Sequence, residues 1–229
     1  MLTRLVLVVS LIPFGLLLLL ARQPLNQVDR AVAHDLYAGA LADPAWTRLL
    51  LLWTDALGPA TWRIVVIAIA AWLIWKGRLG AGAWALTVIV AGGLLGEALK
   101  IVIDRARPAF PDPVATAVGM SFPSGHALTV TLGAGVIVLL LSPRLRGRPV
   151  LLVLAWGIAA FLVLSVSYTR VALGVHWVSD VVAGMLLGVA VLAVLTTTIP
   201  PALPAALTPG TRRRSPGRAR APSPSPRSR

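Results

Sequence analysis

The chain has no cysteine, and it has few acidic residues and few histidines. Its 229 residues include eight Asp and Glu side chains and three His. Without cysteine there is no disulfide framework and no metal site built from thiolates. In a chain this poor in polar side chains, His176 and Asp180, four residues apart in the stretch VALGVHWVSD, require a specific reason.

Charged residues are also scarce, and long apolar runs take their place. The chain is 57% hydrophobic and 13% charged, with a mean hydropathy of +0.84, whereas a soluble domain is about one quarter charged. A helix needs about 20 apolar residues to cross a bilayer. Six stretches reach or approach that length: 3–21, 59–75, 81–103, 126–142, 149–168 and 177–199. Their continuous apolar character is typical of helices, because barrel strands alternate apolar and polar residues.

These runs predict an all-α, polytopic membrane protein with six transmembrane helices over residues 1–199. The first run, with one early arginine, also resembles a secretory signal peptide. No small-residue cleavage site follows it, since Leu19-Leu20-Ala21-Arg22 comes next. We therefore expect the first run to be retained as a membrane helix.

Basic residues predict the orientation of the six spans. They occupy the loops on one side: Lys76, Arg78, Arg144, Arg146 and Arg148. The positive-inside rule makes this side cytoplasmic. We expect both termini on the cytoplasmic side of a bacterial plasma membrane, with three loops facing outward: 22–58, 104–125 and 169–176. Within the first of these loops, apolar residues at helical spacing between Val28 and Ala40 predict an interfacial helix.

The net charge of +13 depends heavily on the C-terminal tail. Seven of the 21 basic residues follow position 210. Residues 200–229 are rich in Pro, Ser and Arg and have no apolar periodicity, which predicts a disordered cytoplasmic tail. We expect this tail to rest against anionic lipid headgroups rather than to bind nucleic acid.

The remaining polar residues gather in three short segments, each at the outward end of a predicted span. In KIVIDRARP, Lys100 and Arg107 are seven residues apart, which places them on one face of a helix. Pro108 marks the end of the span. Taken alone, this segment is better explained by two cations that snorkel to the membrane surface, with Lys100 paired to Asp104.

The second segment, SFPSGHA, predicts the start of a helix. Ser124 suits the N-cap, and the free N–H groups and partial positive charge of a helix start suit a phosphate. Gly125 would let the backbone approach a ligand, and His126 would project from the first turn. A capped helix with an interfacial histidine explains the same residues without a ligand.

The third segment, TRVALGVHWVSD, contains Arg170, His176 and Asp180. If the sixth span begins near His176, Asp180 lies one turn deeper on the same face and can accept an N–H from the imidazole. The other ring nitrogen can then act as a base or nucleophile. Because ionisable groups within a membrane are costly, a functional pair is favoured over a structural one.

Together these segments provide three cations, a helix N-terminus, two histidines and one carboxylate. This set matches phosphoryl transfer, which needs positive charge for the phosphate oxygens, a nucleophile, and an acid for the leaving group. Metal binding is less compatible, because three cations would repel a divalent ion. We therefore expect neither a metal nor another cofactor.

The three segments resemble the signature of the type 2 phosphatidic acid phosphatases: K-x6-R-P, P-S-G-H and S-R-x5-H-x3-D. Every spacing fits, and the one departure is Thr169, which keeps the hydroxyl of the family's serine. The resemblance covers residues 25–199 and implies a six-helix, metal-independent phosphatase. It implies that His176 attacks phosphorus, that Asp180 orients His176, and that His126 protonates the leaving group. The residues that would hold the phosphate are Lys100, Arg107, Ser124, Gly125 and Arg170.

The expected substrate is a lipid phosphate, and membrane lipids are the other expected partners. A polyprenyl diphosphate is preferred over phosphatidic acid or phosphatidylglycerol phosphate, because an outward site suits a carrier released during envelope synthesis. The same motifs would serve a phosphotransferase, and the same pocket would serve a non-enzymatic lipid binder or transporter.

Two further features lie within the apolar spans. Small-residue pairs in GAGVIVLLL and AGGLLGEAL could pack helices within one chain or between the chains of a homo-oligomer. Glu97 lies one turn before Lys100, and we expect it to pair with a cation.

Overall fold

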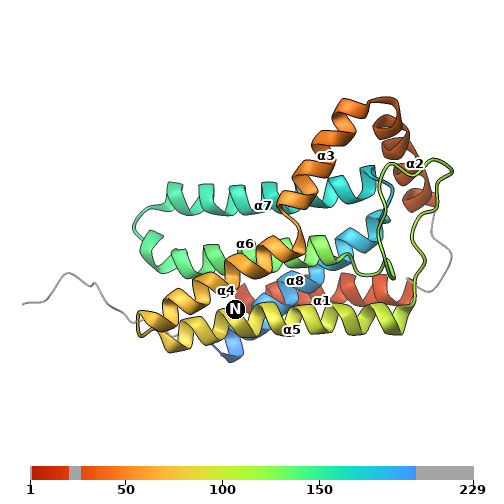
Figure 1. The fold of residues 1–229 in the computed structure, drawn as a ribbon. Coiled ribbons are helices and arrows are strands. Elements are labelled where there is room, and N and C mark those ends of the chain that lie inside the picture. The colour runs from red at the N-terminus through yellow and green to blue at the C-terminus, as the bar shows by residue number, and fades with distance from the viewer. Residues whose placement is uncertain (1, 21–26, 200–229) are drawn as a thin grey trace, which may run out of the picture.

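The structure, a computed structural model, describes residues 2–20 and 27–199 and contains no strand over these residues. Eight helices are present in this part of the chain: α1 (Leu2–Leu20), α2 (Gln27–Ala42), α3 (Pro44–Ala56), α4 (Pro59–Trp75), α5 (Leu79–Ile103), α6 (Gly125–Leu145), α7 (Pro149–Ala172) and α8 (Val178–Thr198). Figure 1 shows α1 and α4 to α8 forming an elongated bundle, with α2 and α3 at one end. The predicted all-α class is confirmed, while the tail, 200–229, lies outside the described residues.

Five helical stretches are long and apolar enough to cross a membrane: Pro44–Trp75, Leu79–Ile103, Gly125–Leu145, Pro149–Ala172 and Val178–Thr198. The remaining predicted span, 3–21, corresponds to α1, whose apolar part, Leu5–Leu19, is shorter. α1 packs along α8, and Phe14 lies in the central core, stacked on Phe122. α1 is therefore an integral part of the helix bundle.

The second span is longer than predicted, because a helix precedes it. The sequence pattern left residues 44–58 in an outward loop, but α3 occupies Pro44–Ala56. Asp43 caps this helix by accepting two N–H groups of its first turn, at 2.9 and 3.0 Å, and proline at the first helical position supports the same start. A break at Gly58 separates α3 from α4.

The interfacial helix predicted after the first span is α2. Of the apolar residues that predicted this helix, Val28 and Val32 are 61% and 36% exposed. The buried face carries Asp29, Ala33 and Tyr37, and α2 packs with α3, α7 and α8. An apolar stripe at a membrane surface can face lipid as well as protein, so the spacing alone did not show which face packs against the bundle.

The central helix of the bundle is α6, which packs against α4, α5, α7 and α8 and is buried along most of its length. Small residues allow the close packing. A Cβ on Gly96 of α5 would lie 2.7 Å from Leu128, and one on Gly135 of α6 would lie 2.3 Å from Leu192 of α8. The small-residue pairs seen in the sequence therefore pack helices within the chain.

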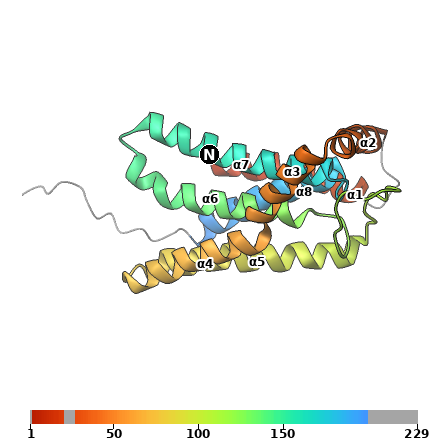
Figure 2. The ribbon, with the colours of Figure 1, turned by 45° about the horizontal axis from the view of Figure 1, so that its top comes forward.

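The two ends of the bundle differ in charge and in structure. The α4–α5 and α6–α7 turns, which carry the basic residues, lie at one end in Figures 1 and 2. The connection 104–124, the α7–α8 turn and α2 lie at the other end. The three polar segments thus share one end, opposite the basic turns.

A Gly184→Ala substitution is expected to destabilise the bundle where α8 crosses α6. The added Cβ would lie 2.6 Å from the carbonyl oxygen of Ser124, a backbone atom that cannot rotate away. Overpacking of this kind costs about 1–3 kcal/mol. Thermal unfolding in detergent measures the effect against Gly157→Ala on α7, where a Cβ meets no atom within 4 Å. Equal stability of the two variants would contradict the α6–α8 contact.

Candidate active site

The three polar segments meet in one cavity of about 660 Å³, which α3 and α4 also line. Six of the eight predicted site residues line it: Lys100, Arg107, Gly125, His126, Arg170 and His176. The other two, Ser124 and Asp180, adjoin the lining residues and are fully buried. The structure therefore brings the whole predicted set together from α5, α6, α7, α8 and their connections.

Lys100 reaches the cavity from the last turn of α5. Its Nζ donates to Oε1 of Glu97 at 2.9 Å, which confirms the expected pairing of Glu97 with a cation. The ion pair of Lys100 is thus with Glu97 and not with Asp104, which instead ends α5 in a left-handed backbone conformation (φ 53°).

Arg107 lies on the connection after α5, and not on the helix face that the spacing predicted. Because α5 ends at Ile103, Arg107 reaches the site from non-helical chain. Its guanidinium donates to the carbonyls of Gly119 and Val175 at 2.8 and 2.7 Å, and its Nη1 lies 3.0 Å from Nε2 of His176. Arg107 therefore ties the connection 104–124 to the turn before α8.

His176 lies just before α8, as the predicted start of the last span at residue 177 leads one to expect. α8 begins at Val178 with Trp177 at the N-cap, and Gly174 (φ 66°) takes the left-handed conformation in the preceding turn. Asp180, in the first turn of α8, remains within reach: its Oδ2 lies 3.4 Å from Nδ1 of His176. The expected pair is formed across the helix start instead of along one helical face.

The contacts of His176 define the tautomer of its imidazole. Arg107 carries only N–H donors, so Nε2 of His176 must accept the hydrogen bond between them. Nδ1 therefore carries the proton and faces the carboxylate of Asp180. His176 thus presents an unprotonated Nε2 at the cavity, as a nucleophile or base requires.

The imidazole of His176 is neutral at ordinary pH. Burial disfavours its charged form and lowers its pKa from 6.5 to about 4. The hydrogen bond and negative charge of Asp180 oppose this shift, and the positive charges of Arg107 and Arg170 add to it.

The helix start predicted at the second segment is present, since α6 begins at Gly125 with Ser124 at the N-cap. The Ser124 side chain makes no capping bond, and its buried Oγ has no hydrogen-bond partner among the described residues. A Cβ on Gly125 would lie 3.6 Å from Nζ of Lys100, so glycine leaves room beside the ammonium group. His126 lines the cavity from the first turn of α6.

Arg170 belongs to the last turn of α7, which continues to Ala172 where the sequence predicted a loop. Its Nη1 donates to Oγ1 of Thr54 on α3 at 3.1 Å, and its buried Nε has no partner among the described residues. Thr169 donates its hydroxyl to the carbonyl of Val166 at 2.6 Å and does not line the cavity. The one departure from the motif pattern therefore lies outside the lining.

The charges around the cavity are mainly positive. Four cations line it, against two carboxylates: Arg63, Lys100, Arg107 and Arg170, with Asp55 and Glu97. Among residues 2–20 and 27–199, no group of three or more His, Asp and Glu side chains is arranged to hold a metal ion. The electrostatics of the cavity suit an anion.

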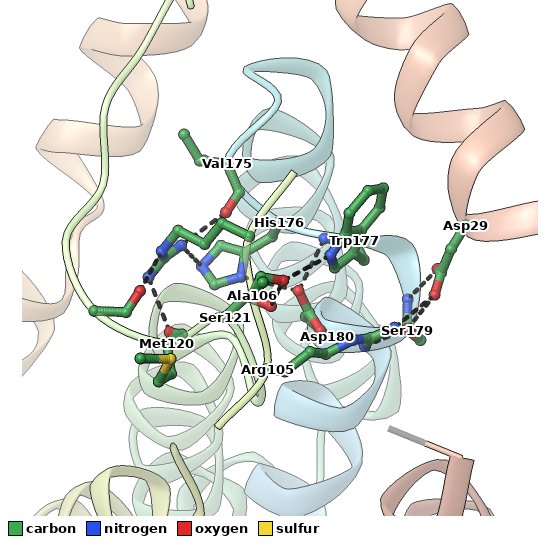
Figure 3. A network of polar contacts seen from close by, with 12 residues as sticks. Asp29, Arg105, Ala106, Met120, Ser121, Val175, His176, Trp177, Ser179 and Asp180 are labelled. Atoms are coloured by element: carbon green, nitrogen blue, oxygen red, sulfur yellow. Dashed lines mark hydrogen bonds and ion pairs between the residues drawn. The ribbon is translucent and has the colours of Figure 1, made fainter. Parts of the chain in front are cut away.

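Two buried residues that the sequence did not single out complete the polar network, as Figure 3 shows. Arg105 donates to Oδ1 of Asp180 at 2.6 Å and to Oδ2 of Asp29 at 3.0 Å. Asp29 lies on α2, 76 residues before Arg105 along the chain. No local sequence pattern pointed to Arg105, because its partners Asp29 and Asp180 are both remote along the chain.

Residues 81–203, more than half of the chain, match the PAP2 superfamily. The chain belongs to this superfamily. The matched residues include all three polar segments, from Lys100 to Asp180. The resemblance to the type 2 phosphatidic acid phosphatases is therefore confirmed.

Similar proteins of the superfamily come from several organisms. The chain is 41% identical over 100 residues to an undecaprenyl-diphosphatase of Sulfolobus acidocaldarius, covering 42% of this chain and 44% of that one. It is 37% identical over 95 residues to phosphatidylglycerophosphatase B of Bacillus subtilis (42% and 46%). It is 36% identical over 112 residues to a decaprenylphosphoryl-5-phosphoribose phosphatase of Mycobacterium tuberculosis (46% and 56%). The matches thus span about half the length of these curated relatives.

The fold is also that of a solved PAP2 protein. A crystal structure of a transmembrane PAP2 type phosphatidylglycerolphosphate phosphatase from Bacillus subtilis superposes with a TM-score of 0.70 at 25% identity. The match covers 82% of this chain and 94% of that one, so nearly the whole helical arrangement is shared.

The low pKa of His176 predicts that its imidazole stays neutral as the pH falls past 6.5 and gains a proton only near pH 4. NMR titration of the protein with labelled histidine measures this, with the resonance assigned by its loss in His176→Ala. A midpoint at or above 6.5 would contradict the buried, neutral imidazole described here.

Proposed function

We propose that this chain is an integral membrane lipid phosphatase that hydrolyses a phosphate monoester or diphosphate of a lipid through a phosphohistidine at His176. The observation that carries the proposal is the neutral imidazole of His176, which presents Nε2 to a cavity lined by cations and is backed by the buried carboxylate of Asp180. A neutral nucleophile beside fixed positive charge is the arrangement that phosphoryl transfer requires.

In the first step, Nε2 of His176 attacks phosphorus and the bond from phosphorus to the leaving oxygen breaks. Nδ1 keeps its proton and donates a hydrogen bond to Asp180. The carboxylate thereby stabilises the positive charge that develops on the ring. His126, which lines the same cavity, gives a proton to the leaving oxygen. Arg107, which donates to Nε2, gives that hydrogen bond to a phosphate oxygen of the substrate during the attack.

In the second step, water attacks the phosphorus of the phosphohistidine. His126 takes a proton from this water as the phosphorus–nitrogen bond breaks, which returns both histidines to their starting states and releases inorganic phosphate. The protein supplies every group for these steps, so we propose that no metal or other cofactor takes part.

The phosphate oxygens would be held by Lys100, Arg107, Arg170, the backbone N–H of Gly125 and the hydroxyl of Ser124. Two of these groups have hydrogen-bonding capacity to spare: Oγ of Ser124 and Nε of Arg170 are buried without a partner among the described residues. Buried polar groups are normally satisfied, and a phosphate oxygen is the partner that the positive cavity favours.

The surroundings of the cavity support a lipid substrate. The residues that line the cavity include those from the last turns of α5 and α7, the first turn of α6 and the turn before α8, at one end of an apolar bundle. An amphiphile can present its headgroup there while its chains stay in the bilayer. Arg63 of α4 lines the cavity in addition to the three motif cations, and a fourth cation favours a headgroup with two phosphates. We therefore prefer a polyprenyl diphosphate, then phosphatidylglycerol phosphate, over phosphatidic acid. The similarity to proteins named for undecaprenyl diphosphate and phosphatidylglycerophosphate supports this class.

The same proposal includes the orientation and domain layout. The basic turns lie at the end of the bundle opposite the connection 104–124 and the α7–α8 turn, which carry cavity residues. By the positive-inside rule the cavity then lies at the extracytoplasmic face of a bacterial plasma membrane, with both termini in the cytoplasm. Residues 1–199 form the phosphatase domain, and residues 200–229 form a cytoplasmic tail.

Phosphate release by the detergent-purified protein tests the function. The wild-type protein is expected to release phosphate in EDTA, faster from a polyprenyl diphosphate than from phosphatidic acid. His176→Ala removes the nucleophile and should lower the rate at least about 1,000-fold, whereas His34→Ala changes an exposed histidine on α2 and should have no effect.

Each departure from this result points to a different function. Loss of activity in EDTA would indicate a metal enzyme, and full activity of His176→Ala would exclude it as the nucleophile. Transfer of phosphate to an added alcohol in preference to water would indicate a phosphotransferase. A folded protein that binds lipid phosphates without releasing phosphate would indicate a binder or transporter.

A further inference from the structure

The carboxylate of Asp180 divides its two oxygens between two different tasks. Oδ2 accepts the backbone N–H of Trp177 at 2.9 Å and faces Nδ1 of His176 at 3.4 Å. Oδ1 is held by Nη1 of Arg105 at 2.6 Å. Figure 3 shows this division, with His176 and Arg105 on different sides of the Asp180 carboxylate.

Arg105 is a buried cation with two carboxylate partners. Its side chain is 8% exposed, and it forms ion pairs with Asp180 at 2.6 Å and with Asp29 at 3.0 Å. A buried charge is tolerated only when it is paired and hydrogen-bonded. Arg105 therefore compensates the charge of Asp180, and it fixes which oxygen remains directed at His176.

Asp29 holds the guanidinium of Arg105 in place by its ion pair, and it also connects α2 to the start of α8. Its side chain is 5% exposed, and its Oδ1 accepts the backbone N–H of Ser179 at 2.9 Å. The hydroxyl of Ser179 donates to Oδ2 of Asp29 and accepts from Arg105 at 2.8 Å. Asp29 thus meets the N-terminal end of α8, where a negative charge is favourable.

We propose that Arg105 and Asp29 are positioning residues that hold the carboxylate of Asp180 towards Nδ1 of His176 during the reaction. The inference rests on the proposed function, because it assigns the groups that orient the proposed nucleophile. Neither Arg105 nor Asp29 lines the cavity, so both act through Asp180 and not through the substrate. The catalytic unit therefore includes α2, which precedes the residues matched to the superfamily.

The kinetic test compares three variants with two controls. Arg105→Gln and Asp29→Asn should lower kcat about 10- to 100-fold, the usual effect of removing a group that orients a reacting side chain. KM should change less than about 3-fold, because the phosphate-holding residues are untouched. Arg105→Lys should restore part of the loss. The controls, Arg30→Gln and Asp35→Asn, change exposed residues of α2 and should leave kcat unchanged.

A double-mutant cycle separates positioning from general stability. If Arg105 acts through Asp180, adding Arg105→Gln to Asp180→Asn should lower kcat less than about 3-fold further. A full second loss of 10-fold or more, or an unchanged kcat in the folded single variants, would overturn the proposal. If Arg105→Gln does not fold, Arg105→Lys and Asp29→Asn decide the question by the same measures.

The tautomer of His176 gives a readout that does not depend on activity. Nitrogen chemical shifts of the labelled imidazole should show the Nδ1–H form in the wild-type protein, and a mixture of tautomers in Asp29→Asn and Arg105→Gln. An unchanged tautomer in both folded variants would overturn the proposal. A wild-type protein without phosphatase activity would instead refute the proposed function, and the tautomer would still decide the role of Arg105 and Asp29.

Discussion

The structure depends on the burial of one carboxylate, that of Asp180, which is wholly excluded from solvent. A buried charge must be paired and hydrogen-bonded, and the groups that do so come from three different parts of the chain. Arg105 approaches from the connection after α5, His176 and the N–H of Trp177 approach from the turn before α8, and α2 supports Arg105 through Asp29. The convergence of the polar segments is thus a condition for folding as well as for chemistry.

One backbone contact between α6 and α8 serves both the packing of these helices and the geometry of the site. The backbone N–H of Ser124 donates to the backbone carbonyl of Asp180 at 3.0 Å, which joins the start of α6 to the start of α8. Gly184, one turn further along α8, lets the two helices approach at this level, because a Cβ there would meet the Ser124 carbonyl. The spacing of α6 and α8 therefore sets the distance between the helix start at Gly125 and the imidazole of His176. The close backbone contacts between α6 and α8 thus fix the relative positions of the polar groups of the site.

Local sequence patterns predicted much of this arrangement, and their failures have physical causes. Continuous apolar runs located the spans, and motif spacing located the cavity residues, because both depend on neighbours along the chain. The burial of Asp29 could not be predicted, since apolar spacing on α2 cannot distinguish a face against lipid from one against protein. Arg105 was missed because its partner Asp29 is remote in sequence. His176 and Asp180 were expected on one helical face because periodicity does not reveal the capping bond to Trp177 that starts the helix at Val178.

The central claim is that His176 forms a bond to phosphorus, and the most direct measurement is to trap that bond. The protein is mixed with a lipid phosphate carrying labelled phosphorus, quenched in alkali within the first turnover, digested, and its peptides are analysed by mass spectrometry. The account predicts labelled phosphate on the imidazole of His176, stable in alkali and lost in acid, and none in His176→Ala. An active protein that never carries the label on His176 would contradict it, because water would then attack the substrate directly.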